Sequence, residues 1–209
     1  MKMNIPNQLT MLRMILVPVF VACLIYINDP FVCGIVTAVV FGLTAFTDML
    51  DGKIARKYNL ITNFGKFMDS VADKFMMFAA MLTLTAKFAP YANLSEIKLH
   101  ACILFHVLLW STVIMFLREL GVTSIRLVCA GTDVGVIPAN YFGKLKTVFQ
   151  IASVVIILLE FAINEGGKLN GFNTYYIASY VSLAAMVFMT VASGINYIKI
   201  YGKYIDTNK

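Results

Sequence analysis

The sequence predicts an all-α integral membrane protein with six transmembrane helices and both termini on the cytoplasmic side. Hydrophobic residues make up 60% of the 209 residues and charged residues only 13%, whereas soluble domains have about 45–50% and about 25%. A membrane-spanning helix needs about 20 mainly apolar residues. Such stretches occur at residues 9–27, 32–56, 64–88, 98–118, 142–163 and 174–198.

Turn-forming and polar residues separate these stretches. Pro6 precedes the first stretch and suits the start of a helix, where its missing N–H costs no hydrogen bond. The breaks carry NDP at 28–30 and KYN at 57–59, followed by longer connections at 90–95, 131–140 and 166–173. No linker or low-complexity segment interrupts the chain, so residues 1–209 are expected to form a single membrane domain.

The basic residues predict the orientation in the membrane. With the N-terminus in the cytoplasm, only Lys87, Lys98 and Lys168 of the 17 Lys and Arg fall on the outer side. This bias follows the positive-inside rule. The net charge of +6 is therefore explained by membrane topology and by attraction to anionic lipid, and we expect no nucleic-acid partner.

Two pairs of aspartates stand out, one near the end of the second stretch and one near the start of the third. Asp48 and Asp51 are three residues apart and Asp69 and Asp73 are four apart, so each pair shares one helical face. In an antiparallel hairpin of straight helices, both cross-pairs have their midpoint near Leu60. We therefore expect Asp51 opposite Asp69 and Asp48 opposite Asp73. Each charge costs roughly 2.5–3.5 kcal/mol at mid-bilayer, so a cation is expected among them.

Two small residues of the same hairpin share that midpoint. Ala55 and Gly65 are predicted to lie opposite one another, and small side chains there would let the two helix backbones approach closely.

Four convergent carboxylates predict a metal site. Oxygen ligands alone select hard cations, Mg²⁺, Mn²⁺ or Ca²⁺, over zinc. Four aspartates around a small volume suggest two such ions, for which we expect Mg²⁺, with Mn²⁺ as the alternative. Paired divalent ions are a recurring device for displacement at phosphorus. A set of buried ion pairs with neighbouring lysines and arginines is a competing interpretation. A divalent-cation transporter is another, disfavoured because no related second half or broken helix surrounds the aspartates.

Further polar residues form two groups at the ends of other stretches. Asn7, Thr10 and Arg13 recur every three residues and could share a face, although a polar helix start with a snorkelling arginine also explains them. Arg118, Arg126, Lys144 and Lys146 are either flanking charges or a pocket for a second anion. Because Lys144 and Lys146 point about 200° apart on a helix, one of them is expected in such a pocket, and we favour Lys146.

The aspartate region resembles the signature of the CDP-alcohol phosphotransferase family, D-x2-D-G-x2-A-R-x8-G-x3-D-x3-D. The matching positions are Asp48, Asp51, Gly52, Ala55, Arg56, Gly65, Asp69 and Asp73. The segments NIPNQLTMLR at 4–13, FLRELGVTSIR at 116–126 and GKLKT at 143–147 resemble the bacterial phosphatidylglycerophosphate synthase branch of that family.

The resemblance implies a reaction and a set of partners. The phosphatidyl group of CDP-diacylglycerol would pass to the primary hydroxyl of sn-glycerol 3-phosphate, giving phosphatidylglycerophosphate and CMP. Inositol phosphate and phosphatidylglycerol are alternative acceptors with the same chemistry. A homodimer in the bacterial cell membrane is implied, with the active site on the cytoplasmic side.

The resemblance also implies roles for the residues named above. Asp48, Asp51, Asp69 and Asp73 would bind the metals, and Asp73 would be the general base. Gly52, Arg56 and Thr62 would contact CDP-diacylglycerol, with Asn7, Thr10 and Arg13 beside them. The acceptor phosphate would be held by Arg118, Arg126, Lys144 and Lys146.

Overall fold

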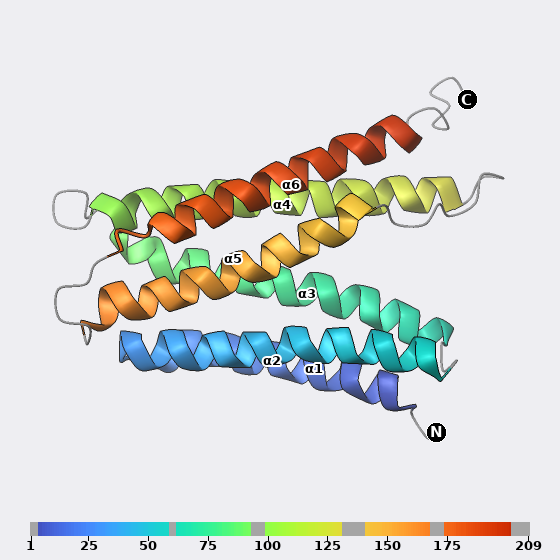
Figure 1. Cartoon of the computed structure of the whole chain (residues 1–209), viewed down its shortest axis with the longest axis horizontal. Coiled ribbons are helices and arrows are strands. Elements are labelled where there is room, and N and C mark those ends of the chain that lie inside the picture. The colour runs from blue at the N-terminus through green and yellow to red at the C-terminus, as the bar shows by residue number, and fades with distance from the viewer. Residues whose placement is uncertain (1–3, 59–61, 93–98, 131–140, 168–173, 202–209) are drawn as a thin grey trace.

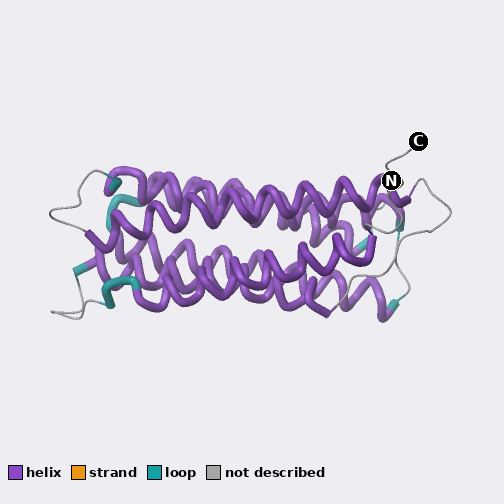
Figure 2. Tube along the Cα trace, turned by 90° about the horizontal axis from the view of Figure 1, so that it is seen from above, coloured by secondary structure: helices purple, strands orange, loops and turns teal. Residues whose placement is uncertain are grey.

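The computed structural model describes residues 4–58, 62–92, 99–130, 141–167 and 174–201. This part of the chain forms long α-helices and one 3₁₀ turn, η1 (Ala89–Tyr91), and contains no strand. The helices are α1 (Ile5–Tyr26), α2 (Pro30–Lys57), α3 (Asn63–Phe88), α4 (Leu99–Ala130), α5 (Tyr141–Gly166) and α6 (Ile177–Tyr201). They run side by side along one axis, in both views (Figures 1 and 2).

The helix starts follow from short local motifs. The Asp29 carboxylate accepts hydrogen bonds from the backbone N–H groups of Phe31 and Val32, and Pro30 takes the first helical position of α2. The hydroxyl of Thr62 caps α3 by accepting from the Gly65 N–H at 3.0 Å. Both caps satisfy donors that a helix leaves unpaired at its start.

α4 is longer than the sequence predicted. The fourth stretch was expected to end at residue 118, but the helix continues to Ala130. Gly121 alone does not break it, and the hydroxyls of Thr123 and Ser124 bond back to carbonyls four residues earlier. Arg118 and Arg126 therefore lie eight residues apart on one helix, close to a single face.

The core is built by close packing between neighbouring helices. The rings of Phe20 on α1 and Phe41 on α2 lie 5.5 Å apart, and those of Phe88 on α3 and Phe161 on α5 lie 5.6 Å apart. At Gly34 a Cβ would come within 2.5 Å of the Leu158 carbonyl oxygen. This glycine therefore permits the contact between α2 and α5.

The expected direct hairpin between α2 and α3 is wrong. Among the described residues, α1 packs extensively on both α2 and α3, whereas α2 and α3 share no extended contact. Gly65 accordingly meets α1, since a Cβ there would lie 2.5 Å from Oδ1 of Asn7. The sequence spacing predicted where each aspartate lies along its helix. It carried no information about which helix packs between α2 and α3.

The helices have the character of a membrane protein. Five of them, α1, α2, α4, α5 and α6, are long and apolar enough to cross a bilayer. α3 does not meet that criterion because charged residues, including Asp69, Asp73 and Lys74, are spread along it. The start of α1, the end of α2 and the end of α6 lie at the same end of the bundle (Figure 1), and the aspartates lie towards that end.

Candidate active site

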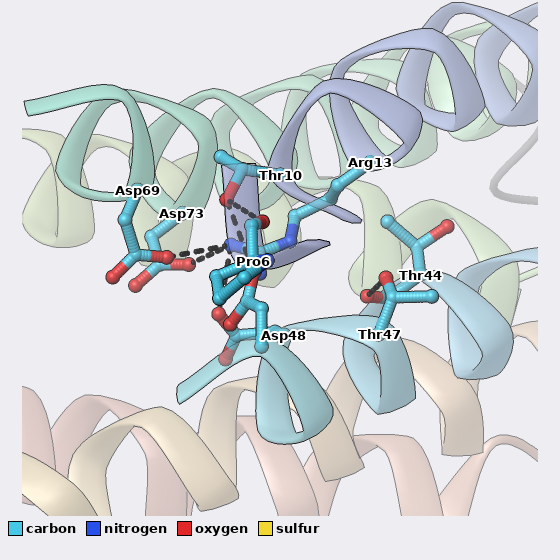
Figure 3. Close-up of polar contacts among 9 residues, drawn as sticks. Pro6, Thr10, Arg13, Thr44, Thr47, Asp48, Asp69 and Asp73 are labelled. Atoms are coloured by element: carbon cyan, nitrogen blue, oxygen red, sulfur yellow. Dashed lines mark hydrogen bonds and ion pairs between the residues drawn. The ribbon is translucent and has the colours of Figure 1, made fainter. Parts of the chain in front are cut away.

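Arg13 is at the centre of the aspartate cluster. Its side chain projects from α1 and is 0% exposed. Nη1 lies 2.7 Å from Oδ1 of Asp48, 3.2 Å from Oδ1 of Asp69 and 2.7 Å from Oδ1 of Asp73. Nη2 donates to Oδ2 of Asp51 at 2.5 Å. Figure 3 shows the guanidinium between Asp69 and Asp73 of α3 and Asp48 of α2.

This arrangement corrects the snorkelling interpretation of Arg13. The charge does not reach towards the membrane surface but is buried among the four carboxylates. The competing interpretation of buried ion pairs concerned Lys53, Arg56, Lys66 and Lys74. The side chains of Arg56 and Lys66 lie outside the described part of the structure, and within that part the ion pairs of the aspartates are made by Arg13. The cation expected among the acids is thus supplied by α1.

Thr10 joins the cluster one turn before Arg13. Its hydroxyl lies 3.1 Å from the Pro6 carbonyl and 3.2 Å from Oδ2 of Asp51. Thr10 and Asp51 are only 3% and 4% exposed. The Asp51 carboxylate is therefore held from α1 by two donors, the hydroxyl and the guanidinium.

The donor set fits a divalent cation. One oxygen from each of Asp48, Asp51 and Asp69 lies within 4.8 Å of the others. The single guanidinium of Arg13 offsets one of the four carboxylate charges. Oxygen-only sites with surplus negative charge suit Mg²⁺ or Mn²⁺. The residues present therefore match the metal that the resemblance implied.

A pocket of about 190 Å³ adjoins the aspartate cluster. It lies among α3, α4 and α5, and Asp73 is part of its wall. The rest of its lining is Ser70, Lys74, Met77, Phe78, Glu119, Arg126, Lys146, Thr147 and Gln150. Asp73 thus faces both the Arg13 cluster and a basic pocket.

Three basic side chains in or beside this pocket, Lys146, Arg118 and Arg126, each have a partner. Lys146 contacts the Glu119 carboxylate, and Nη1 of Arg118 donates to the same oxygen at 3.1 Å. Arg126 donates to the Tyr197 hydroxyl and stacks over that ring at 4.9 Å from its centre. Lys146 is 7% exposed.

Several buried donors here have no hydrogen-bond partner within the described ranges. They are Nε of Arg118, Nε of Arg126 and Nε2 of Gln150. Buried donors are normally paired in folded proteins. Together with the charge of Lys146, they make the pocket suited to an anion that brings its own acceptor oxygens.

The sequence model of the CDP-alcohol phosphatidyltransferase family matches residues 3–194. The chain belongs to this family. Related proteins include the Bacillus subtilis CDP-diacylglycerol–glycerol-3-phosphate 3-phosphatidyltransferase, 35% identical over 93% of each chain. The protein of the same name from Rickettsia felis is 33% identical over 96% of this chain and 97% of the relative. A probable phosphatidylglycerophosphate synthase of Mycobacterium tuberculosis H37Rv is 34% identical over 93% of this chain and 80% of the relative.

The other predicted site residues of this phosphatidyltransferase lie around the same end of the bundle. Asn7 packs against Gly65, and the Thr62 hydroxyl caps α3. Gly52 lies in α2 next to Asp51. Arg56 and Lys144 lie in α2 and α5, but their side chains fall outside the described part of the structure.

Three residues of the candidate site were missed from the sequence. Glu119 pairs with the basic residues, Tyr197 supports Arg126 from α6, and Gln150 lines the pocket. One of them had a usable signal, because Gln150 follows Lys146 by four residues and shares its helix face. Tyr197 had none, since it lies 71 residues from its partner in the chain.

Proposed function

We propose that this enzyme transfers the phosphatidyl group of CDP-diacylglycerol to sn-glycerol 3-phosphate, giving phosphatidylglycerophosphate and CMP. The observation that carries the proposal is the position of Asp73. Asp73 is one of the four aspartates that contact Arg13, and it also lines the pocket that holds Arg126 and Lys146. One carboxylate thus borders a site for a diphosphate on metal and a site for a phosphorylated acceptor.

The aspartates would hold the cofactor. Asp48, Asp51, Asp69 and Asp73 are the proposed ligands of two Mg²⁺ ions, with Mn²⁺ as an alternative. When bound, the ions would screen the charge on the phosphoryl oxygens. Arg13 and Thr10 fix the Asp51 carboxylate from α1, so the ligand set is held in position from a third helix.

The donor substrate would lie beside the aspartates. Gly52, Arg56 and Thr62 are proposed to contact CDP-diacylglycerol, bordered by Asn7, Thr10 and Arg13. Gly52 adds no side chain beside Asp51, which leaves room for a ligand near the backbone. The buried Nε of Arg13 has no hydrogen-bond partner among the described residues, which supports a place for Arg13 at the edge of this site.

The acceptor would lie in the basic pocket. Arg118, Arg126, Lys144 and Lys146 are proposed to bind its phosphate, with Lys146 as the lysine of α5 that lines the pocket among the described side chains. A basic pocket favours a phosphorylated alcohol, because serine, ethanolamine and choline have no phosphate to place there. The names of the relatives support glycerol 3-phosphate as that alcohol.

The proposed chemical step is a single displacement. Asp73 accepts the proton of the acceptor's primary hydroxyl, and the hydroxyl oxygen forms a bond to the phosphorus that carries diacylglycerol. The bond from that phosphorus to the oxygen of CMP breaks, and CMP leaves with the electron pair. Arg126 and Lys146 hold the distant phosphate, which keeps the hydroxyl near Asp73.

We further propose that α3 also crosses the membrane, giving six spans, with this end of the bundle in the cytoplasm and the chain forming a homodimer in a bacterial cell membrane. The distribution of Lys and Arg supports this orientation. In the cytoplasm the site would face a water-soluble acceptor.

An acceptor screen tests the proposal. Purified protein receives CDP-diacylglycerol, Mg²⁺ and one alcohol at a time, and CMP release is followed. The proposal predicts turnover with sn-glycerol 3-phosphate. Turnover with inositol phosphate or phosphatidylglycerol, and none with glycerol 3-phosphate, would show that the proposed acceptor is wrong. If no alcohol leads to CMP release, the transferase activity of the purified chain is refuted.

A further inference from the structure

The described lining of the basic pocket contains one buried neutral polar side chain for which the proposed reaction has no role. Gln150 on α5 is 2% exposed and lines the pocket together with Asp73 and Lys146. Its amide nitrogen has no hydrogen-bond partner within the described part of the chain. A primary amide nitrogen carries two N–H donors, and buried donors are normally paired. The unpaired donor therefore points to a bound ligand.

The position of Gln150 indicates which part of a ligand it meets. It follows Lys146 by one turn on the same face of α5, and Asp73 lines the same pocket from α3. The pocket therefore offers cations, the two carboxylates of Asp73 and Glu119, and a neutral amide. With the acceptor phosphate at Lys146 and its reacting C1 hydroxyl at Asp73, the C2 hydroxyl is the polar group left for the amide.

Other neutral polar groups in the pocket are less suited to this role. The Thr147 hydroxyl donates to the Gly143 carbonyl of its own helix at 3.3 Å. Ser70 lies on α3 in an exposed position. Gln150 combines burial with an unpaired donor, which neither of these does.

We infer that Gln150 is a specificity-determining residue whose Nε2 donates a hydrogen bond to the C2 hydroxyl of the acceptor. This inference rests on the proposed function. It assigns the pocket to small phosphorylated polyols in preference to phosphorylated alcohols that lack the second hydroxyl. The volume of about 190 Å³ agrees, because it lies below the roughly 300–1,000 Å³ of sites for larger ligands. A lipid acceptor such as phosphatidylglycerol is accordingly disfavoured.

The test compares two acceptors that differ by one hydroxyl. CMP release is measured with sn-glycerol 3-phosphate and with 3-hydroxypropyl phosphate, which keeps the phosphate and the primary hydroxyl. We expect kcat/KM of the wild type to favour glycerol 3-phosphate by about 10–100-fold, since the second acceptor leaves a buried donor unpaired. In Gln150→Met we expect this preference to disappear, because kcat/KM falls for glycerol 3-phosphate and stays unchanged for 3-hydroxypropyl phosphate.

A matched variant on the same helix controls for general effects. Ser153 lies one turn beyond Gln150, and its hydroxyl is bonded to the carbonyls of Phe149 and Ser182. Ser153→Ala should retain the wild-type preference between the two acceptors.

Three results would contradict the inference. Equal use of both acceptors by the wild type overturns it without any variant, even if Gln150→Met fails to fold. An equal loss on both acceptors in Gln150→Met means that the residue only supports packing. If the wild type releases no CMP from CDP-diacylglycerol with either acceptor, the proposed function itself is overturned, and the inference with it.

Discussion

Nη1 of Arg13 lies 2.7 Å from Oδ1 of Asp73, so the first helix directly contacts the carboxylate proposed to take the acceptor's proton. The same guanidinium reaches Asp48 and Asp51 on α2. α1 therefore lies between the two aspartate-bearing helices and provides their shared counterion. The positions of the carboxylates depend on this one buried cation.

Replacing Arg13 should destabilise the protein and increase its response to metal. Arg13→Gln leaves the aspartates without their cation, and removing one partner of a buried pair costs about 3 kcal/mol. We expect a lower melting temperature in EDTA and a larger rise with Mg²⁺ than in the wild type, because bound metal supplies the missing charge.

Thermal unfolding in detergent, with and without Mg²⁺, measures both effects. Lys199→Gln is the control, since Lys199 is an exposed cation near the end of α6. An Arg13→Gln protein with wild-type stability and a wild-type response to Mg²⁺ would show that Arg13 is not the counterion of the site.

Replacing Asp73 should separate catalysis from donor binding. Asp73→Asn removes the proposed base, and general-base catalysis contributes about 10²–10⁴-fold to a rate. We expect kcat to fall by at least that factor while CDP-diacylglycerol binding, measured with a labelled donor, is largely retained.

Asp29→Asn is the matched control for this change. Asp29 caps α2 near the opposite end of that helix, and asparagine caps helices as well as aspartate does. Its activity should equal that of the wild type. Near-normal turnover in Asp73→Asn would exclude Asp73 as the base.

The sequence predicted the helices of this fold well because their signals are local. Apolar runs, Asp29-Pro30 and Thr62 determine where helices form and start. The exception is the end of α4, where the apolar stretch ends at residue 118 but the helix continues through polar residues to Ala130. Their hydroxyls bond to their own helix, so they do not end it.

The candidate site was predictable only in part. The spacing of the aspartates indicated that Asp48, Asp51 and Asp69 converge, as their oxygens do in the structure. That α1 lies between α2 and α3, and that Arg13 pairs with all four acids, depends on packing between distant segments. Likewise, Glu119 could not be placed against Lys146 from spacing alone, because 27 residues separate them.

Replacing Arg126 should weaken acceptor binding and leave the donor unaffected. The side chain lines the basic pocket and is not among the contacts of the aspartate cluster in the described structure. A hydrogen bond to a charged group is worth about 1.5–3 kcal/mol, so Arg126→Ala should raise the KM for glycerol 3-phosphate by about 10–100-fold.

Steady-state kinetics with each substrate varied in turn provides the measurement, with Lys199→Ala as the control for lost charge at this end. A rise confined to the KM for CDP-diacylglycerol would mean that the two pockets are assigned the wrong way round.

Replacing Glu119 should make stability depend on the acceptor. Glu119 is the acidic partner of Lys146 and Arg118, whose side chains are 8% and 10% exposed. Glu119→Gln leaves two buried cations without a carboxylate, which lowers the melting temperature. Added glycerol 3-phosphate should restore more stability in this variant than in the wild type, because its phosphate replaces the lost charge.

Melting temperatures across a titration of glycerol 3-phosphate decide the matter, with glycerol as the uncharged control. If the variant and the wild type melt alike and respond alike, Glu119 does not compensate the basic pocket.

The fate of the phosphate that carries diacylglycerol tests the central claim most directly. CDP-diacylglycerol labelled at that phosphorus is incubated with the purified protein, Mg²⁺ and sn-glycerol 3-phosphate, and the products are separated. Attack at the labelled phosphorus, with CMP as the leaving group, predicts that all transferred label appears in phosphatidylglycerophosphate and that CMP is unlabelled. Label released with the nucleotide as CDP, or no labelled lipid product beyond the donor, would contradict the account.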